Sequence, residues 1–221
     1  MKEKVLISWS SGKDSALALY EILQERQYRV VALLTTVTEG YDRVSMHGVR
    51  RSLLEKQSQS LGFPLEKVFI SPQANNQEYQ DKMGATMRKY QRLGVTGVVF
   101  GDLFLEDVRQ YREENLAQVG MRALEPLWGH DTRELAQRVI DLGFKAVTTC
   151  VDSQALDQRF AGKTLDKQFL DELPDRVDPC GENGEFHTFV YDGPIFKEAI
   201  DVQPGEVVFR EDRFYYCDLI D

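Results

Sequence analysis

The first hundred residues alternate short apolar runs with stretches of helical periodicity, and this alternation restricts the fold more than any other feature of the chain. The runs expected to form strands are residues 5–9, 30–34, 68–70 and 95–100, and the segments expected to form helices between them are residues 14–26, 48–61 and 76–92. Residues 30–34 are apolar throughout, which is typical of a strand buried on both faces. Because alternating strands and helices connect by right-handed crossovers, we predict a parallel sheet with helices on both faces. Ligands of such sheets bind at the carboxyl ends of the strands.

Beyond residue 125 the pattern changes, and we expect a second, smaller domain. Asp131 and Glu134 have the spacing of a helix capping box and Gly143 is a stop signal, so a helix is predicted between them. The β-rich runs of this half are residues 146–151, 188–190, 206–210 and 214–217, with a hairpin turn over 210–213. The predicted organisation is an α/β domain over residues 1–125 and a mostly antiparallel α+β domain over residues 126–221.

Charge is distributed unevenly between these two parts. The formal net charge is −9. Residues 1–125 carry 17 basic and 16 acidic side chains, whereas residues 126–221 carry 10 and 20. A sequence-independent nucleic-acid binder needs the opposite sign, so a nucleic-acid partner is disfavoured. The acidic part serves either solubility or the recognition of a protein, a small molecule or an ammonium ion.

The sequence also bears on compartment. No apolar run approaches the roughly 20 residues that span a bilayer. The early run at residues 5–7 is followed by Lys13 and Asp14, which makes it too short for the core of a signal peptide. The three cysteines show no CxxC spacing, which argues against a disulfide framework or a zinc knuckle. We therefore expect a cytoplasmic protein with reduced thiols.

The most informative motif is the loop over residues 8–15, Ser-Trp-Ser-Ser-Gly-Lys-Asp-Ser, between the first strand and the first helix. Its small residues let backbone N–H groups approach an anion, and the helix amino terminus adds unpaired N–H groups and its dipole. Lys13 supplies a positive charge, Ser10 and Ser15 supply hydroxyls, and Asp14 is a candidate ligand for Mg²⁺. The loop lacks the glycine that a Walker A motif requires five residues before Gly-Lys. The simpler alternative is a polar helix cap with a chance lysine.

This loop resembles the PP-loop of the N-type ATP pyrophosphatases, also called adenine nucleotide alpha hydrolases. The resemblance implies a Rossmann-like parallel sheet and cleavage of ATP into AMP and pyrophosphate. It also implies that an acceptor oxygen is adenylylated and then displaced by a nitrogen or sulfur nucleophile. Ser11 stands where many members have a second glycine. The nucleotide-binding residues implied are Ser8, Ser10, Ser11, Gly12, Lys13, Asp14, Ser15, Leu34, Thr35, Met46 and Gly101.

A second signature lies at residues 181–196, Gly-Glu-Asn-Gly-Glu-Phe-His-Thr-Phe-Val-Tyr-Asp-Gly-Pro-Ile-Phe. Together with Gly101-Asp102 and Glu125-Pro126-Leu127-Trp128, it resembles the diphthine–ammonia ligase family, of the ATP-binding domain 4 type. The resemblance covers nearly the whole chain. Asn183 stands where a glycine is common and His187 where a glutamate is common.

The resemblance implies an AMP-forming amide ligase of diphthamide synthesis, with ATP and Mg²⁺ as cofactors. Its substrates would be ammonia or another amine and an acceptor carboxylate on a protein or small molecule. Two other functions stay open from the sequence: a PP-loop enzyme with a different small-molecule or RNA acceptor, and a non-catalytic adenine-nucleotide sensor. Oligomeric state is also open, with a homodimer as one assembly compatible with the sequence.

Five residues are the candidates for catalysis: Lys13, Asp14, Asp102, Glu185 and His187. Glu185 and His187 are two apart, so in an extended segment they point the same way and can bind an ammonium nucleophile or remove its proton. The alternative is a polar turn that stabilises the second domain. Asp102 follows the fourth strand, where it is expected to contact Mg²⁺ or to orient the acceptor. The alternative is a helix cap for residues 103–119, and the two roles are compatible.

Three more side chains near the expected sheet edge have alternative roles. Arg109 and Arg112 lie on one face of the helix expected over 103–119 and either neutralise pyrophosphate or pair with carboxylates such as Glu113 and Asp107. The pairing is the interpretation we favour. Trp128 is interpreted as a packing residue rather than a stacking platform for substrate.

Overall fold

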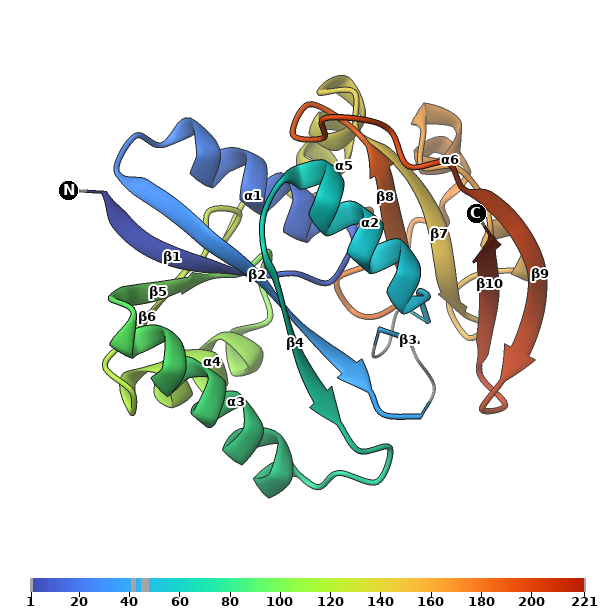
Figure 1. Cartoon of the computed structure of the whole chain (residues 1–221). Helices are drawn as coiled ribbons and strands as arrows, with labels where there is room; N and C mark the ends of the chain where they lie inside the picture. The colour runs from blue at the N-terminus through green and yellow to red at the C-terminus, as the bar shows by residue number, and fades with distance from the viewer. Residues whose placement is uncertain (1, 41–42, 45–47, 221) are drawn as a thin grey trace.

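The computed structural model describes residues 2–40, 43–44 and 48–220, which form two sheets (Figure 1). The strands of the first sheet are β1 (Glu3–Ser8), β2 (Tyr28–Thr38), β3 (Arg43–Val44), β4 (Leu65–Ile70), β5 (Val95–Val99) and β6 (Arg122–Leu124). Five of them are parallel in the order β4-β2-β1-β5-β6, and the short β3 pairs antiparallel with the end of β2. This confirms the predicted Rossmann-like parallel sheet.

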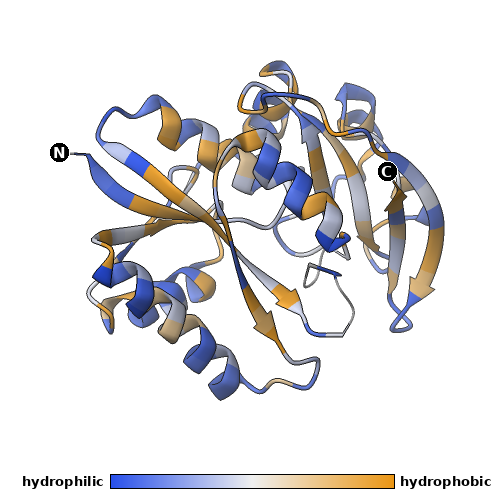
Figure 2. Cartoon of the chain, viewed as in Figure 1, coloured by the Kyte–Doolittle hydropathy of each residue, from blue (hydrophilic) through white to orange (hydrophobic). Residues whose placement is uncertain are grey.

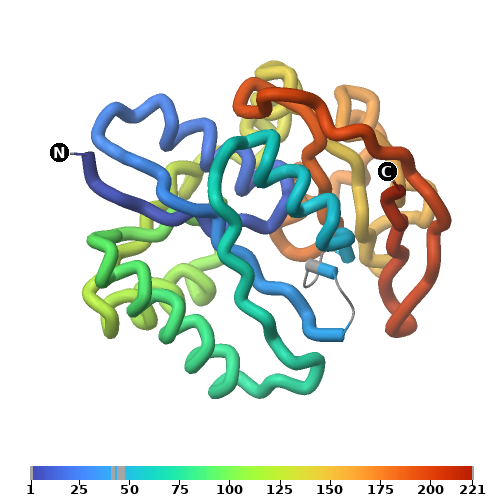
Figure 3. The backbone as a smooth tube through the Cα atoms, in the orientation of Figure 1, coloured from blue at the N-terminus to red at the C-terminus, as the bar shows by residue number. Residues whose placement is uncertain are grey.

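The helices of this half cover both faces of the sheet. They are α1 (Lys13–Gln24), α2 (Arg51–Leu61), α3 (Asn76–Arg92) and α4 (Glu106–Ala117). Helices α1 and α2 lie on one side of the sheet and α3 and α4 on the other (Figures 1 and 3). Successive side chains of a strand point to opposite faces of the sheet, and both faces are buried here. In β1, Val5 and Ile7 belong to one buried cluster, while Leu6 belongs to the cluster that includes Met87 of α3 and Leu116 of α4.

The second sheet is antiparallel, in the order β8-β7-β10-β9. Its strands and helices are β7 (Lys145–Asp152), β8 (Phe186–Asp192), β9 (Gln203–Arg210), β10 (Phe214–Ile220), α5 (Thr132–Asp141), the 3-10 helix η1 (Gln158–Phe160) and α6 (Lys167–Glu172). The predicted hairpin turn joins β9 to β10, with Glu211 and Asp212 both left-handed at φ 56° and 50°. The antiparallel tail is therefore confirmed.

The two sheets share one hydrophobic core. Trp9 and Leu17 of the first half and Phe186 and Phe189 of β8 belong to the same buried cluster. Hydrophobic residues run along strands of both sheets (Figure 2). Because β8 contacts α1, the second half lies directly against the β1–α1 loop.

Several element boundaries differ from those predicted. The helix expected from residue 103 begins at Glu106, and its cap residue Leu105 offers no side-chain cap, so the interpretation of Asp102 as a helix cap is wrong. The helix expected from residue 48 begins at Arg51. Strand β2 continues to Thr38, beyond residue 34, where the expected strand ends. The capping box is confirmed, since Asp131 accepts a hydrogen bond from the Glu134 backbone N–H at 2.9 Å.

Within residues 2–40, 43–44 and 48–220, no helix combines the length and the apolar character needed to cross a membrane.

Candidate functional site

The β1–α1 loop lies at the carboxyl edge of the sheet, at the point where the strand order reverses. Strand β1 is flanked by β2 and β5, and the helices that follow these two strands cover opposite faces (Figure 1). In parallel α/β sheets this switch point is where ligands bind. The loop that the sequence singles out therefore occupies the position at which the fold offers a binding crevice.

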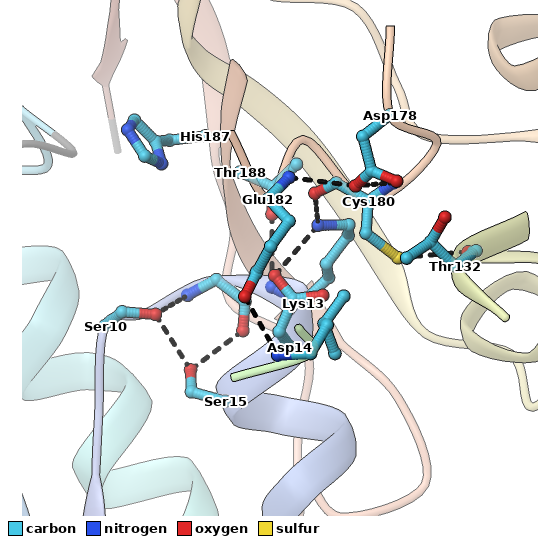
Figure 4. Close-up of polar contacts among 12 residues, drawn as sticks. Ser10, Lys13, Asp14, Ser15, Thr132, Asp178, Cys180, Glu182, His187 and Thr188 are labelled. Carbon is cyan, nitrogen blue, oxygen red and sulfur yellow. Dashed lines mark hydrogen bonds and ion pairs between the residues drawn. The ribbon is translucent and has the colours of Figure 1, made fainter. Parts of the chain in front are cut away.

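The loop has an unusual backbone at Ser11. Its φ of 74° is left-handed, a conformation that costs a non-glycine residue roughly 1–2 kcal/mol. A glycine at this position, as in many PP-loops, would adopt it without strain. In the same loop, the Ser10 hydroxyl contacts the Ser15 hydroxyl at 3.1 Å and accepts a hydrogen bond from the Gly12 N–H at 3.3 Å (Figure 4). The loop thus gathers two hydroxyls and a backbone donor on one side.

Lys13 is buried at the join of the two halves, with only 2% of its side chain exposed. Its ammonium donates to the Asp14 carboxylate at 2.9 Å and to the Cys180 carbonyl, and its backbone N–H donates to the Thr188 hydroxyl at 3.1 Å. Burial disfavours the charge, but its neighbours, with Asp14 first among them and Glu182 contributing, together outweigh burial and hold the pKa of Lys13 above its usual value. Lys13 therefore stays protonated, with its charge paired to Asp14.

Strand β5 brings Gly101 and Asp102 against the start of α1. A Cβ atom on Gly101 would lie 2.7 Å from the Asp14 carbonyl carbon, so only glycine allows this approach. Asp102 pairs with Arg112 at 2.7 Å. Burial raises the pKa of Asp102, and Arg112 only partly opposes that rise.

Glu182 reaches across from the second half to this edge. It accepts a hydrogen bond from the Leu103 N–H at 2.8 Å. Burial, reinforced by the nearby carboxylates of Asp14 and Asp102, raises the pKa of Glu182 to about 7. Figure 4 shows its side chain extending over Lys13 and Asp14. The sequence indicates Glu182 only as part of the turn, because nothing in the local pattern shows which glutamate faces the loop.

Glu185 is oriented by its own turn instead. Its carboxylate accepts hydrogen bonds from the Asp178 N–H and from both the backbone N–H and the side-chain amide of Asn183, each at 3.0 Å. Because β8 begins at Phe186, Glu185 precedes the extended segment that the predicted pairing with His187 required. These contacts fit the alternative of a stabilising turn.

His187 lies on β8, and its ring points away from Lys13 and Glu182 (Figure 4). Burial, together with the charge of Lys13, lowers the pKa of His187 to about 4, so its imidazole is neutral at pH 7. Among the five candidates for catalysis, the structure brings together Lys13, Asp14 and Asp102, and it adds Glu182 to them.

A cavity of about 990 Å³ opens beside the loop, between α3 and α4. Its floor at the sheet edge includes Ser8, Leu34 and Phe100. Thr35 is buried and is not among the lining residues. Met46 and His47 lie outside the described residues.

The arginines of α4 are paired. Arg109 contacts Glu125 at 2.9 Å and Glu113 at 3.1 Å, and its guanidinium lies 4.5 Å from the centroid of a Trp128 ring. Arg112 contacts Asp102, as described above. The pairing interpretation therefore fits both arginines, with Glu125 and Asp102 as partners rather than Asp107.

The described residues contain no group of three or more His, Cys, Asp or Glu side chains arranged to hold a metal ion. Cys150, Cys180 and Cys217 are all buried and free.

A parallel sheet with a lysine-bearing loop at its switch point and a helix amino terminus behind that loop defines a nucleotide-binding α/β protein. The particular family follows from comparison with known proteins. The chain belongs to the diphthamide synthase family: residues 1–123 match the family's N-terminal domain and residues 131–219 its C-terminal domain.

Curated relatives agree with this assignment. A diphthine–ammonia ligase of Danio rerio is 26% identical over 225 aligned residues, covering 92% of this chain and 88% of the relative. The Homo sapiens diphthine–ammonia ligase is 28% identical over 179 residues, covering 78% and 67%. That of Schizosaccharomyces pombe is 29% identical over 225 residues, covering 93% of this chain but 37% of the longer relative.

Proposed function

We propose that this protein is an ATP-dependent ligase that adenylylates an acceptor carboxylate, releases pyrophosphate, and forms an amide with ammonia as AMP leaves. The acceptor class is the one named by its relatives, diphthine. The observation that carries the proposal is the meeting of Lys13, Asp14, Asp102 and Glu182 where the two halves join. Both halves belong to one family, and the charged groups of the site come from both.

ATP is proposed to lie along the carboxyl edge of the sheet. Its phosphates bind the loop over residues 10–15, where Lys13 and the amino terminus of α1 supply positive charge. Its adenosine enters the end of the cavity floored by Ser8, Leu34 and Phe100. Lys13 exchanges its contact with the Cys180 carbonyl for a phosphate oxygen and stabilises the leaving pyrophosphate.

Magnesium is proposed to bind at Asp14. The Asp14 side chain is 28% exposed, and its Oδ2 atom contacts Lys13. The carboxylates of Asp14 and Asp102 lie close enough to Glu182 to contribute to the rise of its pKa. Carboxylate oxygens are the donors that Mg²⁺ prefers, so Asp14, together with phosphate oxygens of ATP, would supply its ligands. When bound, Mg²⁺ would neutralise charge on the phosphates.

Glu182 is proposed to take the role first expected of Glu185 and His187, the binding and deprotonation of the ammonium nucleophile. A carboxylate with a pKa near neutrality can accept such a proton. Glu185 is already occupied by three N–H donors of its turn. The acidic character of residues 126–221 also favours approach of a cation.

The proposal is tested with ATP radiolabelled at the α phosphate, a diphthine-bearing protein and ammonium. We expect labelled AMP that depends on the acceptor, together with pyrophosphate and an amide product. The Lys13→Ala variant should lose this activity. Labelled ADP in place of AMP would contradict the proposal.

A further inference from the structure

Gln57 is a fully buried polar residue whose role the reaction described above does not explain. It lies on α2, with 0% of its surface exposed, between the β1–α1 loop and strand β8. A buried side-chain amide is costly unless its donors and acceptor are paired. All of the polar atoms of Gln57 are paired, and each partner belongs to the loop or to β8.

The contacts of Gln57 join three segments. Its Oε1 atom accepts from the Trp9 indole N–H at 2.9 Å. Its Nε2 atom donates to the Ser11 carbonyl at 3.1 Å and to the Val190 carbonyl at 2.7 Å. The Ser11 carbonyl also accepts from the Val190 N–H at 3.0 Å. Four hydrogen bonds thus fix the loop between a helix of the first half and a strand of the second.

These hydrogen bonds fix the peptide group between Ser11 and Gly12. Its orientation decides whether an N–H group or a carbonyl oxygen of the loop faces a bound anion. The described chain has no cis peptide bond, so the Ser11 carbonyl and the Gly12 N–H point in opposite directions. Because the carbonyl is bound to Gln57 and β8, the Gly12 N–H is directed to the side of the Ser10 and Ser15 hydroxyls (Figure 4). A flipped peptide would present a carbonyl oxygen to the phosphates and repel them.

This orientation needs external support. Ser11 is left-handed at φ 74°, a backbone conformation that is strained for any residue other than glycine. Residues in strained conformations persist only where their surroundings hold them. The two bonds to the Ser11 carbonyl, from Gln57 and Val190, supply that hold.

We propose that Gln57 is a positioning residue for phosphate binding: by holding the Ser11 carbonyl against β8, it directs the Gly12 N–H toward the phosphates of ATP. The inference rests on the proposed ATP site. It makes the phosphate loop a product of both halves of the chain, since Val190 completes the same network. Loss of Gln57 weakens binding of the phosphates and leaves binding of adenosine in the α3–α4 cavity unchanged.

The test compares the affinities of Gln57→Leu and wild type for three probes: ATP, inorganic pyrophosphate and adenosine. We expect the Kd for ATP and for pyrophosphate to rise at least about tenfold, the effect of losing one to two buried hydrogen bonds. The Kd for adenosine should not change. Gln59→Leu is the matched control, because Gln59 is exposed on the same helix, and it should leave all three affinities at the wild-type level.

Two results would overturn the inference. One is an unchanged Kd for ATP in a folded Gln57→Leu variant, and the other is an equal loss of ATP and adenosine binding, which would indicate a general structural role. Should Gln57→Leu not fold, Gln57→Glu keeps the acceptor for Trp9 but turns an oxygen toward two carbonyls, and it should show the same selective loss. Failure of both variants to fold would also overturn it.

These measurements are separable from the proposed ligase activity. If wild type binds ATP yet produces ADP, the ligase function fails and the positioning role of Gln57 stands. If wild type produces AMP and Gln57→Leu binds ATP normally, the positioning role fails and the ligase function stands.

Discussion

Single residues at the join of the two halves show how the loop obtains its chemistry. Lys13 keeps its charge although it is buried, because the Asp14 carboxylate is adjacent. The pKa of Glu182 is raised to about 7 because its carboxyl is buried beside two further carboxylates. These properties depend on contacts between residues far apart in the chain. For this reason the sequence predicted Lys13, Asp14 and Asp102 at the site but pointed to Glu185 where Glu182 reaches it.

Ser11→Gly should stabilise the protein. Glycine relieves the left-handed strain at φ 74°, and the change removes a buried hydroxyl that has no hydrogen-bond partner within the described part of the chain. The greater backbone entropy of glycine in the unfolded state partly offsets these gains in stability. We expect the free energy of unfolding, measured in urea, to rise by about 0.5–1 kcal/mol. Ser11→Ala, which keeps the strained Cβ, should gain less, and a loss of stability in Ser11→Gly would refute the strain.

Glu182→Gln should change how stability depends on pH. In the folded protein the pKa of Glu182 is raised from 4.5 to about 7, so between these values the native state holds a proton that the unfolded state has released. Stability contributed by this group therefore falls as pH rises through that window. The variant lacks the titration, so in metal-free buffer its Tm relative to wild type should increase from about pH 5 to about pH 8. A Tm difference that is constant with pH would contradict the raised pKa.

Close packing of strand and helix backbones, and not only the loops, determines where the residues of the site lie. The end of β5 meets the start of α1 at Gly101, and β8 pairs its Val190 N–H with the Ser11 carbonyl. The parallel sheet and the antiparallel tail were predictable, because periodicity and turn residues are local signals. Strand β6 and helix α6 were not predicted, since each is too short to show a clear periodicity.

Gly101→Ala should disturb the join of β5 and α1. The added methyl group would lie 2.7 Å from the Asp14 backbone, which cannot move without shifting the phosphate loop. We expect a loss of about 1–3 kcal/mol in the free energy of unfolding, as for an overpacked core, and weaker ATP binding. In Gly84→Ala the new methyl group meets only the flexible Arg88 side chain on α3, so this control should be neutral or more stable. Equal effects of the two substitutions would show that the close approach does not matter.

At the scale of the whole molecule, the two halves of the chain differ in charge. The first half carries the proposed nucleotide-binding loop, and the acidic second half contributes Glu182, Thr188 and the Cys180 carbonyl to the site. The charge difference was evident from the sequence, but its meaning required the structure, because only the fold places the 178–188 segment over Lys13. We therefore expect the site to form only when both halves are present.

Adenylylation of the acceptor carboxylate is tested most directly by following the oxygen atoms of that carboxylate. A diphthine-bearing protein labelled with heavy oxygen in its acceptor carboxylate is incubated with ATP and ammonium, and the products are analysed by mass spectrometry. Attack of the carboxylate on the α phosphorus, followed by displacement by ammonia, leaves one carboxylate oxygen on AMP. We therefore predict one heavy oxygen in AMP and one in the amide. AMP without the label, or label in inorganic phosphate released beside ADP, would contradict the account.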